Sequence, residues 1–362
     1  MEIPEQLRQV IDETVRCSLF DELDARGLLL AHAVSSSATT DAARWGGALL
    51  RRVVSHCYQS SLQGDLAADV EFDDDQAATR IELALAFGSV TASLLTPRRP
   101  HRGRSVCSVD LLCAVFNLGI GLVDGLCDGA PQFGLRLLRA IQALGLSGAA
   151  RERGLGDRLR SALPASLAAD PTVAFTARII EAFFDLLHSS YPGDERLALR
   201  DHVGARLEEA LEAEIRSVGR PVEIASRDQL IECSRQTSVL PFQIIEHLAT
   251  GDCALPSPAA GALLGEAMWR IDDLVDLIQD ASYGTLNAVL LAAEAPWPAT
   301  ASDGIAALER VISSHAIPLA AAQAAECLDA GLKAAPGGTA ASEDRRLFLS
   351  FVHRYAGIAP SS

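Results

Sequence analysis

The sequence has almost no lysine and few aromatic residues. Lys333 is the one lysine, so every other member of its 31 basic residues is an arginine, and Phe, Trp and Tyr together make up 5% of the chain. A mechanism that needs a lysine at another position is therefore excluded. Alternating β-branched and aromatic runs bounded by turns, which would predict strands, are also missing.

Positive charge is scarce overall. The formal net charge is −16, and 49% of the 362 residues are hydrophobic. A disordered chain would carry fewer apolar residues at such a charge. A strongly acidic protein lacks the positive field that binds phosphate backbones or anionic lipid, so we expect neither nucleic acid nor a membrane surface as partner. Its 47 carboxylates leave cations as the charged partner.

Export and disulfide signals are absent as well. The eight cysteines form no CxxC pair and no Cys/His zinc spacing, and the N-terminus lacks a basic segment followed by an apolar one. The longest apolar run, 111–123, is interrupted by Asn117 and is shorter than a bilayer-spanning helix. We therefore expect a cytoplasmic protein in a reducing compartment, without a transmembrane segment.

Helical periodicity recurs along nearly the whole chain and predicts an all-α fold. Proline and glycine fall between the periodic segments, where helices end. No long linker divides the chain, so we expect one helical domain over residues 1–362. The predicted helices cover 4–21, 41–62, 75–95, 106–127, 130–144, 172–189, 194–218, 226–249, 257–281, 303–313, 316–334 and 342–356.

Two acidic clusters are candidates for a cation site, with acids that face solvent as the competing interpretation. Asp124 and Asp128 lie four residues apart at the end of a very apolar helix, so their like charges repel unless a cation lies between them. Asp272, Asp276 and Asp280 form a similar stripe on a helix that is apolar upstream. Carboxylates in this arrangement suit Mg²⁺, which also takes water and substrate phosphates. A third run, 73–75, is read as helix-end acids.

The helix that carries Asp272, Asp276 and Asp280 also carries a family resemblance. Asp272-Asp273-Leu274-Val275-Asp276 with Asp280 resembles the second aspartate-rich motif of trans-isoprenyl diphosphate synthases. The segment 124–128 resembles the first motif, with Gly125 replacing its second Asp, and 235–237 resembles the Lys-Thr motif with Arg235 in place of the lysine. The resemblance covers about residues 80–300. It implies the class I isoprenoid-synthase fold, a helical bundle with a central apolar cavity.

The departures from the family pattern favour one activity within it. Chain-elongating members bind isopentenyl diphosphate through lysines that this chain lacks; the arginines at 98, 99, 102 and 104 would replace them only in part. What remains is the machinery that ionises an allylic diphosphate. The resemblance thus implies a class I terpene synthase that uses two or three Mg²⁺ ions. Its substrate would be a prenyl diphosphate of the C15–C20 class or a bicyclic diphosphate, and its products a terpene hydrocarbon or alcohol plus diphosphate.

The same resemblance implies a set of site residues. The metal ligands would be Asp124, Asp128, Asp272, Asp276 and Asp280, and the catalytic groups Asp124, Asp272 and Arg235. The substrate-binding residues would be Phe116, Asn117, Ile120, Trp269, Thr237, Asn287, Arg354 and Tyr355. Core packing for Trp269, a turn role for Asn287 and a surface position for Arg354 are the competing interpretations. The glutamates at 208, 209, 212 and 214 are interpreted as a solvated helix face.

Two other hypotheses remain open at this point. A prenyltransferase, elongating a chain or alkylating another acceptor, would share the metal site. A non-catalytic partner subunit would explain Gly125 in the first motif. A homodimer is usual in the family, although no residue of this sequence demonstrates one.

Overall fold

The described part of the chain is all-helical. The computed structural model describes residues 3–31, 40, 44–53, 75–96, 106–129, 131–151, 155–218, 227–255, 259–294, 301–339 and 342–358, and no β-strand occurs among them. The helices are α1 Glu5–Ala25, α4 Asp75–Leu95, α5 Val106–Gly129, α6 Pro131–Leu144, α7 Leu146–Arg151, α8 Leu155–Ala162, α9 Ala165–Ala168, α10 Pro171–Ser190, η1 Asp194–Arg196, α11 Leu197–Val218, α12 Arg227–Thr250, α13 Ala260–Val275, α14 Leu277–Tyr283, α15 Ala288–Ala292, α16 Ala301–Ser313, α17 Ala316–Ala334 and α18 Glu343–Tyr355.

Local chemistry sets where several of these helices begin and end. Asp170 accepts hydrogen bonds from the backbone N–H groups of Thr172 and Val173, while Pro171 occupies the first helical position, so α10 starts with both preferred signals. Helix α14 ends at Gly284, whose φ of 69° is the left-handed conformation that glycine adopts without a Cβ clash.

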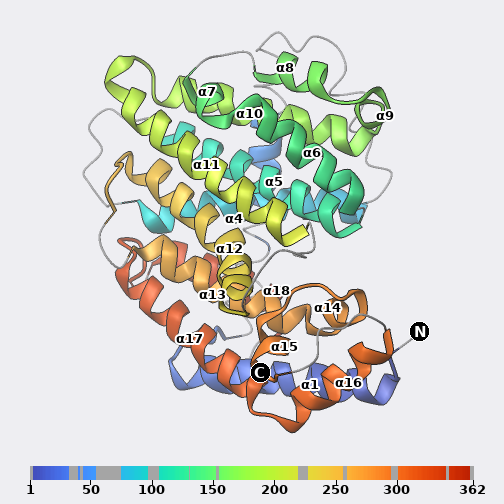
Figure 1. Ribbon diagram of the computed structural model, residues 1–362. Helices are drawn as coiled ribbons and strands as arrows, with labels where there is room; N and C mark the ends of the chain where they lie inside the picture. The colour runs from blue at the N-terminus through green and yellow to red at the C-terminus, as the bar shows by residue number, and fades with distance from the viewer. Residues whose placement is uncertain are drawn as a thin grey trace.

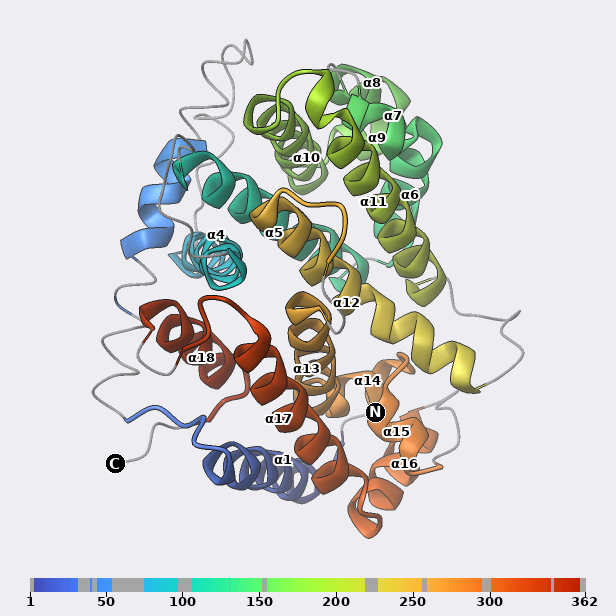
Figure 2. The same cartoon turned by 90° about the vertical axis from the view of Figure 1, so that its left-hand side faces the viewer.

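Helices α4, α5, α12 and α13 link the two ends of the molecule. Helix α5 packs against α4 on one side and α10 on the other, and α12 contacts α4, α5, α11 and α13. The first and the penultimate long helices, α1 and α17, lie side by side at one end, with α6 to α10 at the other (Figure 1). Figure 2 shows α18 between α4 and α17. Residues distant in sequence therefore meet across this core.

Small residues allow α12 and α13 to approach closely. A Cβ on Gly265 of α13 would lie 2.7 Å from the Cα of Val239 and 3.0 Å from the carbonyl oxygen of Ser238 in α12. Those neighbours are backbone atoms, which cannot rotate away. Gly265 therefore sets the separation of two helices whose other residues reach the candidate site.

The helix expected over 257–281 is interrupted. It divides at Asp276, where φ is −92° and ψ is 6°, into α13 and α14. The N–H of Asp276 still bonds the Asp272 carbonyl at 2.8 Å, and the N–H of Asp280 bonds the Asp276 carbonyl at 2.8 Å. The continuous helix expected over 257–281 is therefore wrong, although helical hydrogen bonds still join Asp272 to Asp276 and Asp276 to Asp280.

Among the residues that the structure describes, one helix is long and apolar enough to cross a membrane, or two spans are possible if the bent pair Asp303–Ser313 and Ala316–Ala334 counts as one. The stretch Ser108–Cys127 of α5 passes on length and composition alone. It is longer than the run 111–123 considered above, so shortness is no argument against a span. The same composition is expected of a core helix, and α5 packs against α4, α10 and α12. The absence of a transmembrane segment stays a prediction.

We predict that Gly265→Ala destabilises the protein by about 1–3 kcal/mol, because the added methyl group forces α12 and α13 apart. Gly121→Ala is the matched control on α5, where an added Cβ meets nothing within 4 Å. Replacing a mid-helix glycine there should raise stability by about 0.5–1 kcal/mol. Urea denaturation followed by circular dichroism measures both. Equal stability of the two variants would show that this contact does not limit packing.

Candidate functional site

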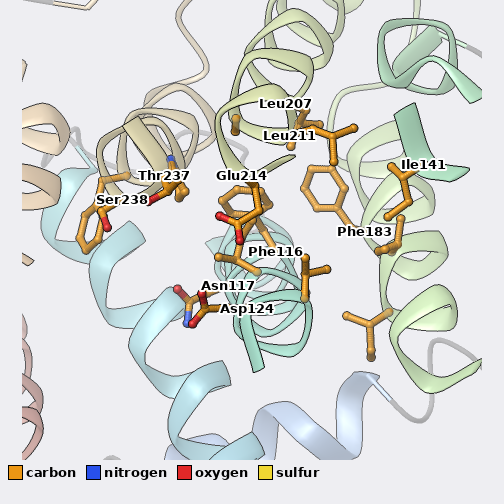
Figure 3. Close-up of a pocket in the computed structure, with 18 of the residues that line it drawn as sticks. Phe116, Asn117, Asp124, Ile141, Phe183, Leu207, Leu211, Glu214, Thr237 and Ser238 are labelled. Atoms are coloured by element: carbon orange, nitrogen blue, oxygen red, sulfur yellow. The ribbon is translucent and has the colours of Figure 1, made fainter. Parts of the chain in front are cut away.

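A cavity of about 300 Å³ lies among α5, α6, α10, α11, α12 and α13, with α7 and α18 each contributing one residue. Its wall is mostly apolar and aromatic. Figure 3 shows apolar lining residues such as Phe116, Phe183 and Leu211 together with polar ones such as Asp124 and Glu214. The lining residues are Val115, Phe116, Asn117, Gly119, Ile120, Val123, Asp124, Leu138, Ile141, Leu146, Ile179, Ile180, Phe183, Phe184, Leu207, Ala210, Leu211, Glu214, Thr237, Ser238, Pro241, Phe242, Met268, Asp272 and Tyr355.

Aromatic rings form one part of this wall. The ring centroids of Phe116 and Phe183 are 5.4 Å apart, and those of Phe183 and Phe184 are 5.1 Å apart with near-perpendicular planes. All three side chains are buried. Such a wall offers an apolar ligand a dry surface and offers a cation the negative faces of aromatic rings.

Asp124 and Asp272, predicted from two motifs 148 positions apart in chain numbering, line the same cavity. Asp124 comes from the last turns of α5, and Asp272 from α13, one turn beyond Met268. Phe116, Asn117 and Ile120 share the wall with Asp124 because they lie one and two turns earlier on α5. Tertiary packing thus brings two carboxylates from separate helices to one mostly apolar cavity.

Tyr355 closes part of the same wall from α18. Its hydroxyl donates a hydrogen bond to Oδ1 of Asp272. Burial around the hydroxyl, the charges of Asp272 and Asp276, and then that hydrogen bond and the charge of Asp124 raise the pKa of Tyr355 well above its usual value, although 43% of the residue remains exposed. Tyr355 is therefore a proton donor at neutral pH, in the field of three carboxylates.

Two polar residues of the wall, Asn117 and Thr237, donate hydrogen bonds to backbone carbonyls, and Pro241 interrupts the hydrogen bonding of α12. The Asn117 side chain donates to the Ala84 carbonyl of α4 at 2.8 Å, and the Thr237 hydroxyl donates to the Ser234 carbonyl at 2.7 Å. Pro241 lies inside α12 and has no N–H, so the Thr237 carbonyl loses the helical hydrogen bond it would otherwise accept.

Glu214 is a charged lining residue that the sequence analysis assigns to a solvated face. We interpreted it as part of a solvated face with its neighbours, yet its side chain projects from α11 into the cavity (Figure 3). On the same helix, Leu211 lines the cavity one turn before Glu214 and Leu207 two turns before it. Their spacing of seven and three residues from Glu214 was the signal that could have identified it.

Asp273, Asp280 and Asn287 form a network that shapes the α13–α15 connection. The Asn287 side chain donates to the Asp273 carbonyl at 2.6 Å and to Oδ2 of Asp280 at 2.9 Å, and its oxygen caps α15 by accepting from Val289 and Leu290. Asp273 is buried and accepts from the Ala288 N–H at 2.9 Å; burial raises its pKa well above the usual value. The structure places Asn287 and Asp280 in this support rather than on the cavity wall.

Other expected site residues also lie away from the cavity. Trp269 is 2% exposed and donates its indole N–H to Ser234 at 2.9 Å, so it packs between α13 and α12. Arg235 pairs with Glu232 at 2.7 Å and with Glu266 at 3.0 Å, and it lines a separate hollow. Arg354 is exposed. The reason is angular: Trp269 and Arg235 are rotated on their helices away from the lining residues Met268 and Thr237.

Some expected residues cannot be placed. Asp128 belongs to the last turn of α5, but its side chain lies outside the described part of the structure, as do the arginines at 98, 99, 102 and 104. Among the described lining residues, none is Lys or Arg. The described lining therefore contributes carboxylates and no cationic side chain of its own.

The donor set fits Mg²⁺ held jointly with a ligand. Within the described ranges, no three His, Cys, Asp or Glu groups converge closely enough to hold a metal ion by themselves. Mg²⁺ requires fewer protein ligands, because it commonly keeps several waters and binds through one or two carboxylates plus substrate phosphates. Asp124 and Asp272, with Asp276 near Tyr355, supply oxygen donors of that kind.

We predict that Asn287→Ala lowers stability by about 2 kcal/mol or more, because it removes a helix cap and leaves buried polar groups without a partner. The exposed Gln279→Ala on α14 is the control and should change stability by less than about 0.5 kcal/mol. Chemical denaturation measures both values. A loss no larger for Asn287→Ala than for the control would contradict its supporting role.

Comparison with known proteins adds no relative to this picture. No protein-family model matches the chain, and neither a curated protein nor a solved structure matches it significantly. The functional argument therefore depends on the cavity, its carboxylates and the motifs of the sequence.

Proposed function

We propose that the protein is a Mg²⁺-dependent class I terpene synthase of the isoprenoid-synthase fold, acting on an allylic prenyl diphosphate. The observation that carries the proposal is the position of Asp124 and Asp272 on one mostly apolar cavity. An amphiphile with a long hydrocarbon chain and a diphosphate group matches such a surface at both ends. The missing lysines favour this activity over chain elongation.

The reaction requires the allylic C–O bond to break, with the electron pair leaving on the diphosphate and a carbocation remaining. Bound Mg²⁺ would supply the charge that neutralises the departing diphosphate. Asp124 and Asp272 would hold the ions, and Tyr355 would orient the Asp272 carboxylate through its hydrogen bond. The Phe116 and Phe183 rings would exclude water and stabilise the cation through their faces.

The chain must also end the reaction by removing a proton from the cation. Glu214 is the carboxylate on the α11 part of the wall, where Leu207 and Leu211 are its neighbours along the helix. A carboxylate facing a carbocation is a suitable proton acceptor. Proton transfer to Glu214 would form the alkene, and water capture would form an alcohol instead.

We predict that Asp124→Asn and Asp272→Asn each reduce Mg²⁺-dependent diphosphate release by about a hundredfold or more, because each removes a charged ligand from the leaving-group site. Asp194→Asn, at an exposed position in η1, should retain wild-type release. Purified full-length protein is incubated with C10, C15, C20 and bicyclic diphosphates, and the products are identified by mass spectrometry.

The same assay separates the competing functions. A hydrocarbon or alcohol formed without a second substrate supports the proposal. A longer diphosphate formed only with added isopentenyl diphosphate would replace it with a prenyltransferase. No Mg²⁺-dependent turnover of any of these substrates would overturn it in favour of a partner subunit.

We predict that Glu214→Gln shifts the product from alkene to alcohol while diphosphate release continues, because glutamine keeps the shape but does not take the proton. Glu212→Gln is the control on the same helix, where Glu212 is exposed and pairs with Arg216. The alkene-to-alcohol ratio is measured by gas chromatography. An unchanged ratio in Glu214→Gln would remove Glu214 from the termination step.

A further inference from the structure

Two histidines meet between α11 and α12, outside the cavity described above. His202 Nε2 lies 3.0 Å from His247 Nε2, and the ring planes are inclined at 70°. The residues are 45 positions apart, so no short metal-binding spacing in the sequence marks them. His247 is buried, whereas His202 is half-buried and open to entering ions.

A backbone contact sets the proton on one of these rings. His247 Nδ1 lies 2.8 Å from the Asp252 carbonyl oxygen, which can only accept, so Nδ1 carries the hydrogen. The lone pair of His247 is therefore on Nε2, the atom that faces His202. A metal-binding histidine commonly has this arrangement, with its second nitrogen donating to a backbone carbonyl.

The separation of the two nitrogens suits a shared metal ion. With metal–nitrogen bonds of about 2.0–2.1 Å, two imidazole ligands lie roughly 2.9 Å apart in square-planar and roughly 3.3 Å apart in tetrahedral geometry. The observed 3.0 Å lies between these values. Because His247 Nε2 holds the lone pair, the contact is a hydrogen bond in which His202 Nε2–H donates to it. For metal binding the His202 proton would move to Nδ1, and a small rotation of the half-buried His202 ring would then direct both Nε2 lone pairs at one ion.

Burial and neighbouring groups lower the pKa of both histidines. Burial first, and then the Arg206 charge, lower the pKa of His202, while Glu209 raises it; burial, followed by His202 and Arg206, lowers the pKa of His247 against the Asp252 contact. Arg206 pairs with Glu209 at 2.6 Å, so its repulsion of a cation is offset. Neutral imidazoles are the form that binds metal.

A neighbouring hollow gives access from solvent. It has a volume of about 570 Å³, and His247, Arg206, Gln243 and the exposed Cys253 contribute to its wall. The ion would thus retain water in its remaining coordination positions. Arg235 and Glu266 also line the hollow but pair with each other at 3.0 Å.

We propose that His202 and His247 form a chelating site for one transition-metal ion with imidazole preference, such as Zn²⁺, Ni²⁺ or Cu²⁺, which fastens α11 to α12. Both helices line the cavity, α11 through Leu207 and Leu211 and α12 through Thr237 and Ser238. Metal at the histidine pair would therefore stiffen the wall of the candidate active site from outside. Mg²⁺, which prefers oxygen ligands, would not compete for it.

The test is titration of purified, metal-stripped full-length protein with Ni²⁺ and Zn²⁺ in excess Mg²⁺, followed by calorimetry and thermal melting. We expect one ion per chain and a higher melting temperature, because the ion binds the folded state. His202→Ala should weaken binding on the order of tenfold or more. The milder His202→Asn should do the same, and it separates loss of the metal ligand from a folding defect of the alanine variant. His315→Ala, at an exposed position before α17, should leave it unchanged.

Two results would overturn the proposal. One is equal affinity of the wild type and both His202 variants. The other is loss of binding in Cys253→Ser while the His202 variants still bind, which would place the ion on the thiol instead. The readout involves no turnover, so its failure is separate from failure of the proposed terpene synthase activity.

Discussion

Close packing of α12 against α13 and α5 is the constraint on which the rest of the structure depends. Because Gly265 has no side chain, the α12 backbone packs directly against α13 at this point. Helix α12 also contacts α5, which carries Asp124. This packing holds Asp124 and Asp272 on one mostly apolar cavity despite their like charge. Carboxylates kept together in apolar surroundings favour a cation between them, and an amphiphilic anion can accompany that cation.

The aspartates of α13 have two different roles: one faces the cavity, and the other supports the fold. Asp272 faces the cavity and receives the Tyr355 hydroxyl, whereas Asp273 is buried and anchors the start of α15. The turn at Asp276 and the contacts of Asn287 direct Asp280 into this support. One run of similar residues therefore contains both ligand candidates and structural carboxylates, and helix direction separates them.

The sequence predicted the helical class and most of the helix positions, because apolar periodicity and proline or glycine punctuation are local properties. It also predicted that Asp124, Asp272, Thr237 and the α5 residues Phe116, Asn117 and Ile120 belong together, which the cavity lining agrees with. It failed for Trp269 and Arg235, since a rotation of about 100° per residue separates each from the lining residue that the helix presents.

The amino-acid sequence is enough to show an acidic, arginine-biased, helical chain with carboxylates at helical spacing and no lysine near them. Only the tertiary structure decided which groups meet. In the folded chain Glu214 lines the cavity, α13 and α14 are separate helices that meet at Asp276, and His202 contacts His247. The physical reason is that helix periodicity gives the face on which a residue lies, whereas the neighbour of that face depends on how distant helices pack.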